Sequence, residues 1–241
     1  VGDDWQSINR FAGADISVMT GFKEWFGHGQ IYRLETTFRC PQEICDVSSR
    51  FVSKNPAQLE KSVSSVTPPI GSAIQAFQVG NRNELQGAVA QYLADLYQSL
   101  VDGVVPAGRG GRVTVFILGR YKNDRQYVPE GWHDWFGDRI ELKFKTIHTS
   151  KGDEADYVIL PGLVARGFPN VKSDDPVLGL VMPEGDTYQH SEERRLFYVA
   201  LTRARRSVAM FTVMGKSSPF LDEMIKEGAI TLTNIQGEQI Q

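Results

Sequence analysis

“IHTSKGDEADYVIL” stands at residues 147–160 and joins a polar segment to an apolar run. The run has the length of a strand, and strands that are apolar throughout are typical of a parallel sheet covered by helices on both faces. The polar segment holds a His, two hydroxyls, a Lys-Gly pair and three acids. Lys-Gly beside hydroxyls suggests a phosphate loop, but a P-loop requires G-x-x-x-x-G-K-[ST], which this segment lacks.

Strands and helices alternate along the rest of the chain. Apolar or alternating runs predict strands at 72–79, 112–120, 139–148, 155–164 and 207–213. Helical spacing and capping signals predict helices at 41–51, 85–100, 192–204 and 218–228. This alternation predicts an α/β fold in which helices cover a parallel sheet. The Gly-rich segment 103–112 is interpreted as a linker, because Arg109 and Gly110 stand where a P-loop needs Lys and Ser or Thr.

The composition is that of an ordinary globular protein. The chain has 241 residues, enough for one large or two small domains. No apolar run is long enough to span a bilayer, and the N-terminal stretch lacks a signal-peptide pattern. Cys40 and Cys45 fit neither a zinc site nor a disulfide framework, so we expect reduced thiols in a cytoplasmic protein. The net charge of −3 neither indicates nor excludes a nucleic-acid partner, because a groove can be basic on an acidic protein.

Polar and aromatic side chains follow several expected strands, at the edge where parallel sheets bind their ligands. In chain order they are Gln6, Asn9, Phe11, Phe38, Arg39, His148, Ser150, Lys151 and Glu154. We expect one edge of the sheet to collect them, with Arg203 in reach from the end of the helix at 192–204. Two charged arginines that converge on a cleft indicate an anion, for which a triphosphate is the natural candidate.

Four segments carry a resemblance to one family. In chain order they read “VGDDWQSINRFAGAD” (1–15), “LETTFRCP” (34–41), “FKTIHTSKGDEADYVIL” (144–160) and “EERRLFYVALTRARR” (192–206). They resemble motifs III, IV, V and VI of the UvrD/Rep-type superfamily 1 DNA helicases. The likeness is closest to the helicase IV branch, because the strands and helices expected between Arg39 and Thr146 leave no room for the large subdomain that UvrD and Rep insert there.

The resemblance implies a RecA-like fold of the P-loop NTPase type, without its own Walker A sequence, and a role in binding ATP. In such helicases the motif III Gln senses the γ-phosphate, which assigns that role to Gln6. The motif IV Arg reaches the γ-phosphate and its aromatic neighbour packs on the adenine, which assigns Arg39 and Phe38. The motif V acid meets the ribose and the motif VI Arg acts as an arginine finger, which assigns Glu154 and Arg203. The catalytic residues expected on this chain are therefore Gln6, Arg39 and Arg203.

The resemblance also implies contacts with single-stranded DNA. The motif III aromatic stacks on a base, which assigns Phe11. A Tyr is common at the position of Asn9, which we include among the DNA contacts although it offers no ring to stack. The motif V residues expected near the DNA backbone are His148, Ser150 and Lys151. Arg120, after the strand at 112–120, is a further candidate.

Two parts of an ATP site are missing from the sequence. It contains no Walker A sequence and no Asp-Glu pair after an apolar strand that could hold Mg²⁺. We therefore expect residues 1–15 to be the tail end of a first RecA-like domain, 16–228 a second RecA-like helicase domain and 229–241 a C-terminal tail. The metal would be held by the first domain and by no residue here. The longer protein would be an ATP-dependent DNA helicase acting on single-stranded and duplex DNA, whereas the chain alone is expected to be inactive.

Simpler interpretations exist for each residue. Arg39 and Arg203 could be surface ion-pair partners, Phe11 and Phe38 could belong to the core, and His148 could be a satisfied buried His. Asp3 and Asp4 could suggest a metal pair, but neighbouring side chains on a strand point to opposite faces, which favours a capping role. The chain could also be a non-catalytic module that binds DNA or a partner. A nuclease-fused helicase ranks lower, since no clustered Asp/Glu/Lys site is visible.

Overall fold

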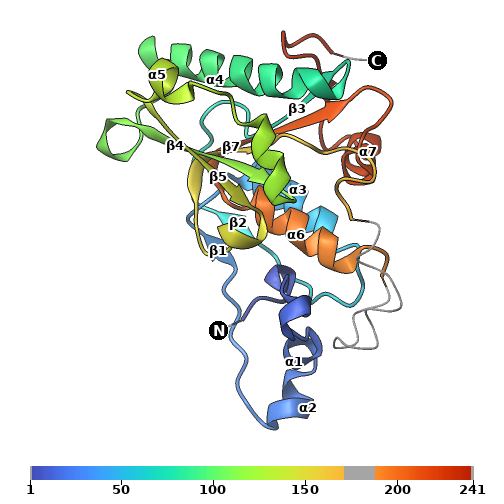
Figure 1. The fold of residues 1–241 in the computed structure, drawn as a ribbon. Coiled ribbons are helices and arrows are strands. Elements are labelled where there is room, and N and C mark those ends of the chain that lie inside the picture. Colours follow the sequence, from blue (N-terminus) through green and yellow to red (C-terminus); the bar gives the residue numbers. More distant parts are fainter. Residues whose placement is uncertain (1, 171–187, 240–241) are drawn as a thin grey trace.

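A six-stranded parallel sheet forms the centre of the molecule. The computed structural model describes residues 2–170 and 188–239. The strand order is β5-β4-β6-β7-β3-β8, and every neighbouring pair is parallel. The strands are β3 (Ile74–Val79), β4 (Val113–Gly119), β5 (Ile140–Thr146), β6 (Ala155–Leu160), β7 (Ala204–Val213) and β8 (Leu232–Thr233). The predicted α/β fold, with a parallel sheet between helices, is confirmed (Figure 1).

Helices cover both faces of this sheet. One face packs against α3 (Gln42–Val52), α6 (Ser191–Leu201) and α7 (Pro219–Lys226), and the other against α4 (Leu85–Val101) and α5 (Trp132–Phe136) (Figure 1). Successive residues of β4 alternate between the two cores, because side chains of a strand point to opposite faces in turn. Phe116 joins the core of α3 and α6, whereas Val115 and Ile117 join the core of α4. All six residues of the central strand β6 are buried.

The N-terminal ends of α6 and α7 can be compared with the helix starts predicted from the sequence. At α7 the prediction is confirmed, because the Ser218 hydroxyl accepts a hydrogen bond from the Phe220 amide and Pro219 is the first helical residue. At α6 it was wrong by one residue. Ser191 lies inside the helix, and His190 occupies the capping position, where its side chain makes no capping hydrogen bond to the helix. The helix also ends at Leu201 rather than 204, so that Arg203 lies in the short link to β7.

The segment 147–154 runs back across the sheet. Thr146, at the end of β5, is level with Gly119 at the end of β4, whereas Tyr157 of β6 is level with Val115. The chain therefore returns from the carboxyl edge of the sheet to its amino edge between β5 and β6. It makes one 3-10 turn on the way, η6 (His148–Ser150). An ion pair between Lys145 Nζ and Asp153 Oδ2, at 2.5 Å, joins the two ends of the crossing and lowers the pKa of Asp153.

The N-terminal residues pack onto this body as turns rather than as the end of a strand. They form two 3-10 turns, η1 (Asp4–Gln6) and η2 (Arg10–Ala12). Trp5 and Ile8 are fully buried in the core of α3 and α6. The predicted division into residues 1–15, 16–228 and 229–241 stays a prediction.

An arm follows these turns and extends away from the sheet (Figure 1). It contains α1 (Ser17–Thr20) and α2 (Phe22–Phe26), which the sequence patterns did not predict. Residues 31–34 form no strand, and the first pairing along the described chain is that of β1 (Thr36–Thr37) with β2 (Ser64–Ser65). Cys40 and Cys45, just beyond, are free and buried, with Sγ atoms 3.5 Å apart. Within the described residues, no helix is long and apolar enough to cross a bilayer.

Candidate functional site

The expected site residues form two groups at opposite edges of the sheet, not one. The expectation of a single carboxyl edge was wrong because the crossing segment 147–154 carries its last residues to the amino ends of β6 and β7. There they meet Arg203, which directly precedes β7. We call this the amino-edge group. It consists of Gln6, Arg39, Lys151, Glu154 and Arg203.

Hydrogen bonds hold the amino-edge group together. The Nη2 atom of Arg203 lies 3.5 Å from the side-chain oxygen of Gln6, and Lys151 Nζ donates to the Gln6 carbonyl at 2.9 Å. Arg39 Nε donates to Glu154 Oε2 at 3.1 Å. The structure therefore brings together residues from four distant parts of the chain, as the sequence predicted, although at the other edge.

Arg203 is a buried cation that forms no ion pair with any carboxylate of the described residues. Its side chain is almost completely enclosed, with the residue only 1% exposed. Among the described residues its hydrogen-bond partners are neutral oxygens: the carbonyls of Val199 (3.0 Å) and Asp153 (3.2 Å), the Thr202 hydroxyl and the Gln6 amide. Burial, together with the positive charge of Arg39, lowers the pKa of Arg203 to about 10. The guanidinium is still charged at pH 7, so this position suits an incoming anion. The interpretation of Arg203 as a surface ion-pair partner is wrong.

Arg39 has a different environment, because it is paired and accessible. Its side chain is 32% exposed and that of its partner Glu154 is 42% exposed. An ion pair this exposed contributes little stability, so an anion of higher charge could displace the carboxylate. Phe38, next to Arg39, is 80% exposed, which excludes the core interpretation and leaves its ring free for a ligand.

The turn that carries Gln6 is fixed from several sides. Asp3 accepts hydrogen bonds from the Trp5 amide and the Gln6 side chain, and Asp4 accepts one from the Leu59 amide. The expected capping role is confirmed for Asp3, whereas Asp4 has a structural role: it joins the turn to the distant Leu59 and pairs with Lys61. Arg195 of α6 also donates to the carbonyl of the following residue, Ser7, at 2.7 Å. The turn is therefore attached to the same helix that leads to Arg203.

The carboxyl-edge group consists of Arg120, His148 and Glu193. The guanidinium of Arg120 binds both carboxylate oxygens of Glu193, with nitrogen–oxygen distances from 2.7 to 3.1 Å. Glu193 lies in the first turn of α6, but it is more than a helix-start charge, because its side chain is only 2% exposed and forms a buried ion pair. Burial lowers the pKa of His148, and the charge of Arg120 lowers it further, so that the imidazole is neutral at pH 7. His148 is only half-buried, so it is not the fully buried His of the simpler interpretation.

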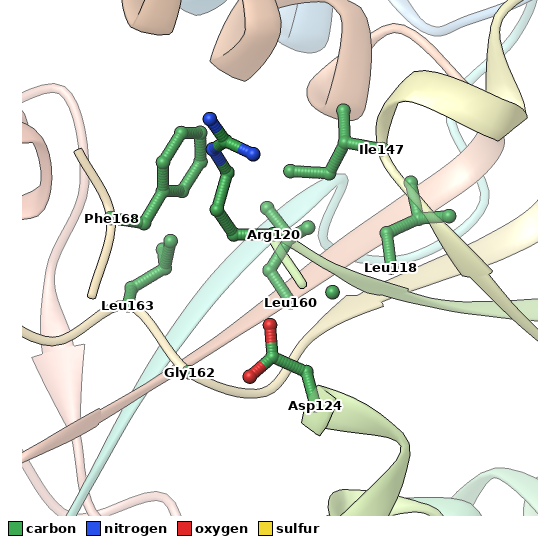
Figure 2. Close-up of a pocket in the computed structure, with 9 residues that line it drawn as sticks. Leu118, Arg120, Asp124, Ile147, Leu160, Gly162, Leu163 and Phe168 are labelled. Carbon is green, nitrogen blue, oxygen red and sulfur yellow. The ribbon is translucent and has the colours of Figure 1, made fainter. Parts of the chain in front are cut away.

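A small cavity and a wider cleft adjoin Arg120. The cavity, of about 10 Å³, has room for one water molecule and is lined by Arg120, Ile147 and Phe168 among others (Figure 2). The cleft, of about 310 Å³, is lined by Arg120, Tyr121 and Tyr127 among others. A guanidinium and two aromatic residues thus border an open space at this edge.

The other residues expected to contact DNA, Ser150, Asn9 and Phe11, have different environments. The hydroxyl of Ser150 is buried and donates to the Ile147 carbonyl at 2.7 Å, so its side chain is not offered to a ligand. Asn9 precedes the turn η2, and its carbonyl accepts hydrogen bonds from Ala12 and Ala14. Phe11 lies within η2, and its side chain is outside what the structure describes. The DNA roles of these residues stay predictions.

The sequence patterns missed Asp156 and Arg205. Asp156 lies in the apolar run of β6, is 4% exposed, and pairs with Arg205 and with Arg206. Arg205 also reaches Glu154, at 3.4 Å. A carboxylate inside an otherwise apolar strand was the available signal, because buried carboxylates require a cation or hydrogen-bond donors.

The chain is similar to several known helicases. Residues 133–214 match the family of UvrD-like helicase C-terminal domains. The chain is 35% identical to DNA helicase IV of Escherichia coli (strain K12) over 225 residues, which is 92% of this chain and 30% of that protein. It is 36% identical over 94 residues to a probable DNA helicase of Mycoplasma pneumoniae, covering 36% of this chain and 16% of that protein. The solved C-terminal domain of a possible DNA helicase from Lactobacillus plantarum covers 81% of this chain, and 98% of that domain is matched, with 17% identity and a TM-score of 0.48.

The buried pair Arg120–Glu193 gives a first testable prediction. Replacing Glu193→Gln leaves Arg120 without a counter-charge, and we expect the free energy of unfolding to fall by about 2–3 kcal/mol. Urea denaturation followed by circular dichroism would measure it. The control is Glu141→Gln in the exposed pair with Lys143, which should change stability by less than about 0.5 kcal/mol. Equal effects of the two substitutions would contradict the assignment of the Glu193 pair as a stabilising contact.

Proposed function

We propose that this chain, whose residues 133–214 match the family of UvrD-like helicase C-terminal domains, is the C-terminal motor half of an ATP-dependent DNA helicase. The helicase translocates on single-stranded DNA, in the 3′ to 5′ direction by resemblance, and unwinds duplex. The chain spans about 30% of the length of the Escherichia coli relative, so the activity belongs to a longer protein. The single observation that carries the proposal is the enclosed guanidinium of Arg203 beside the accessible Arg39.

ATP fits the amino-edge group by charge. Arg203 supplies a buried cation whose described hydrogen-bond partners are neutral. Arg39 supplies a second, accessible cation that can exchange its partner Glu154 for a phosphate. Two guanidinium groups match the oxygens of a terminal phosphate, which gathers negative charge as it is transferred. Gln6, which is hydrogen-bonded to Arg203, senses that phosphate. The exposed ring of Phe38 packs on the adenine base.

The remaining parts of the ATP site come from an N-terminal RecA-like domain of the longer protein. That domain supplies the Walker A sequence and the carboxylates that hold Mg²⁺. When it closes on the amino-edge group, Arg39 moves from Glu154 to the γ-phosphate and Arg203 acts as the arginine finger. Hydrolysis and phosphate release return Arg39 to Glu154. The motor therefore alternates between two arrangements that differ in their affinity for nucleotide.

The crossing segment 147–154 links this cycle to DNA. It begins beside Arg120 with His148 and ends at the amino-edge group with Glu154. The DNA candidates at its first end are Arg120 and His148, and Phe11 stacks on a base from the neighbouring turn. A shift of Glu154 when Arg39 leaves is passed along the segment to the DNA contacts.

The arginine finger can be tested in the longer helicase. Arg203→Ala removes the charge that stabilises the transferred phosphoryl group, and we expect kcat to fall at least about 10³-fold while ATP binding changes little. Steady-state ATP turnover and binding of a fluorescent ATP analogue would measure the two effects. The control is Lys216→Ala, which removes the charge of a basic residue that belongs to neither group. Turnover that survives in Arg203→Ala would exclude Arg203 as the finger.

The chain alone should not hydrolyse ATP, because it holds the arginines but no phosphate cradle. Phosphate release by the purified chain, with and without single-stranded DNA, would be compared with that of its Arg203→Ala variant. Turnover that disappears with this substitution would show that the chain contains a complete site.

Phe11 provides the test on the DNA side. Phe11→Ala in the longer helicase removes one stacked ring, and we expect single-strand affinity to fall by about 1–3 kcal/mol with ATP affinity unchanged. Fluorescence anisotropy of a labelled oligonucleotide would measure the loss. Phe11→Trp, which preserves a ring, should retain most of the affinity. If Phe11→Ala weakened ATP binding instead, Phe11 would contact the nucleotide and not the DNA, contrary to the prediction.

A further inference from the structure

The carboxylate of Glu154 is shared between two arginines. Its Oε2 atom lies 3.1 Å from Arg39 Nε, and its Oε1 atom lies 3.4 Å from Arg205 Nη1. Arg39 belongs to the proposed phosphate site, whereas Arg205 is not one of the residues that would contact the phosphate. The Glu154 side chain is 42% exposed, so that without these two contacts it would be free to reorient.

Arg205 is fixed from its other side by a buried carboxylate. Its Nη2 atom lies 3.2 Å from Asp156 Oδ1. The second oxygen of Asp156 accepts hydrogen bonds from the Thr114 amide (2.8 Å) and hydroxyl (3.0 Å). Asp156 is therefore hydrogen-bonded to the neighbouring strand β4. Its ion pair with Arg205 fixes the guanidinium that also contacts Glu154.

Arg206 is a natural comparison for Arg205. Its Nε atom lies 3.3 Å from the same oxygen of Asp156. Its remaining nitrogens, however, donate to the carbonyls of Pro106 and Ala107. The two arginines thus share one buried partner, but among the described contacts only Arg205 extends from it to Glu154.

We propose that Arg205 is a positioning residue for the ATP site: it holds Glu154 in place when Arg39 exchanges that carboxylate for the γ-phosphate. The inference rests on the proposed function. An unneutralised carboxylate next to a triphosphate repels it, and a carboxylate that can follow Arg39 competes with the phosphate for the guanidinium. Arg205 prevents both, because it keeps a positive charge and a fixed contact on Glu154 throughout the exchange.

The test uses the longer helicase that contains both halves of the ATP site. Arg205→Gln should raise the Kd of a non-hydrolysable ATP analogue and the KM for ATP about three- to five-fold, with kcat nearly unchanged. Arg206→Gln, which leaves Glu154 and its two contacts intact, should leave Kd and KM at the wild-type values. Arg205→Lys keeps a cation above Asp156 but cannot bridge two carboxylates as a guanidinium does, so KM should rise by a smaller factor. This variant also keeps the test valid if Arg205→Gln does not fold.

The decisive measurement is a double substitution. If Arg205 acts through the charge of Glu154, adding Arg205→Gln to a Glu154→Gln protein should raise KM no further. An equal rise of KM in both backgrounds, or equal effects of Arg205→Gln and Arg206→Gln, would overturn the inference while the proposed function stands. A wild-type protein that neither binds nor hydrolyses ATP would overturn both.

Discussion

The burial of one positive charge organises the amino edge of this domain. Arg203 lies between the last turn of α6 and the first residue of β7, enclosed by the crossing segment and the N-terminal turn. Backbone carbonyls orient its guanidinium without neutralising it, and Arg39 adds a second positive charge. Such a position costs stability in the isolated fold. The charge is therefore a feature that the stability of the fold alone does not account for.

The helix α6 determines how far apart the two groups lie. Glu193, in its first turn, binds Arg120 at the carboxyl edge, and Arg203 follows its last turn at the amino edge. A helix of 11 residues is about 16 Å long and spans most of the roughly 20 Å of the six-residue strand β6. The same helix anchors the N-terminal turn through Arg195. One helix thus sets the geometry of the amino-edge and carboxyl-edge groups together.

The sequence predicted five of the six strands of the sheet, four of its five covering helices and every member of the amino-edge group, but neither β8 nor α5. Buried strands and amphipathic helices follow from hydrophobic period, which is a local property, and β6 and α7 show how well it works. The edge at which the residues meet was not predictable in this way, because it depends on the register between β4, β5 and β6. The pairs Arg120–Glu193 and Arg205–Asp156 were missed for a related reason. Each joins residues far apart in the chain, and of the four partners only Asp156, inside an apolar strand, gives a local signal of its burial.

The length of the crossing segment is set by its turns. It must cover roughly 20 Å, about six strand residues back along the sheet. The nine Cα–Cα steps from Thr146 to Ala155 would reach about 30 Å if they were fully extended. The segment is shorter because the Ser150 amide donates to the Ile147 carbonyl and the Asp153 amide donates to the Ser150 carbonyl, which folds it into two successive turns. It therefore acts as a folded spacer: these hydrogen bonds, and not the extension of the chain, fix the distance between the two edges, and loss of either one would let the spacer lengthen.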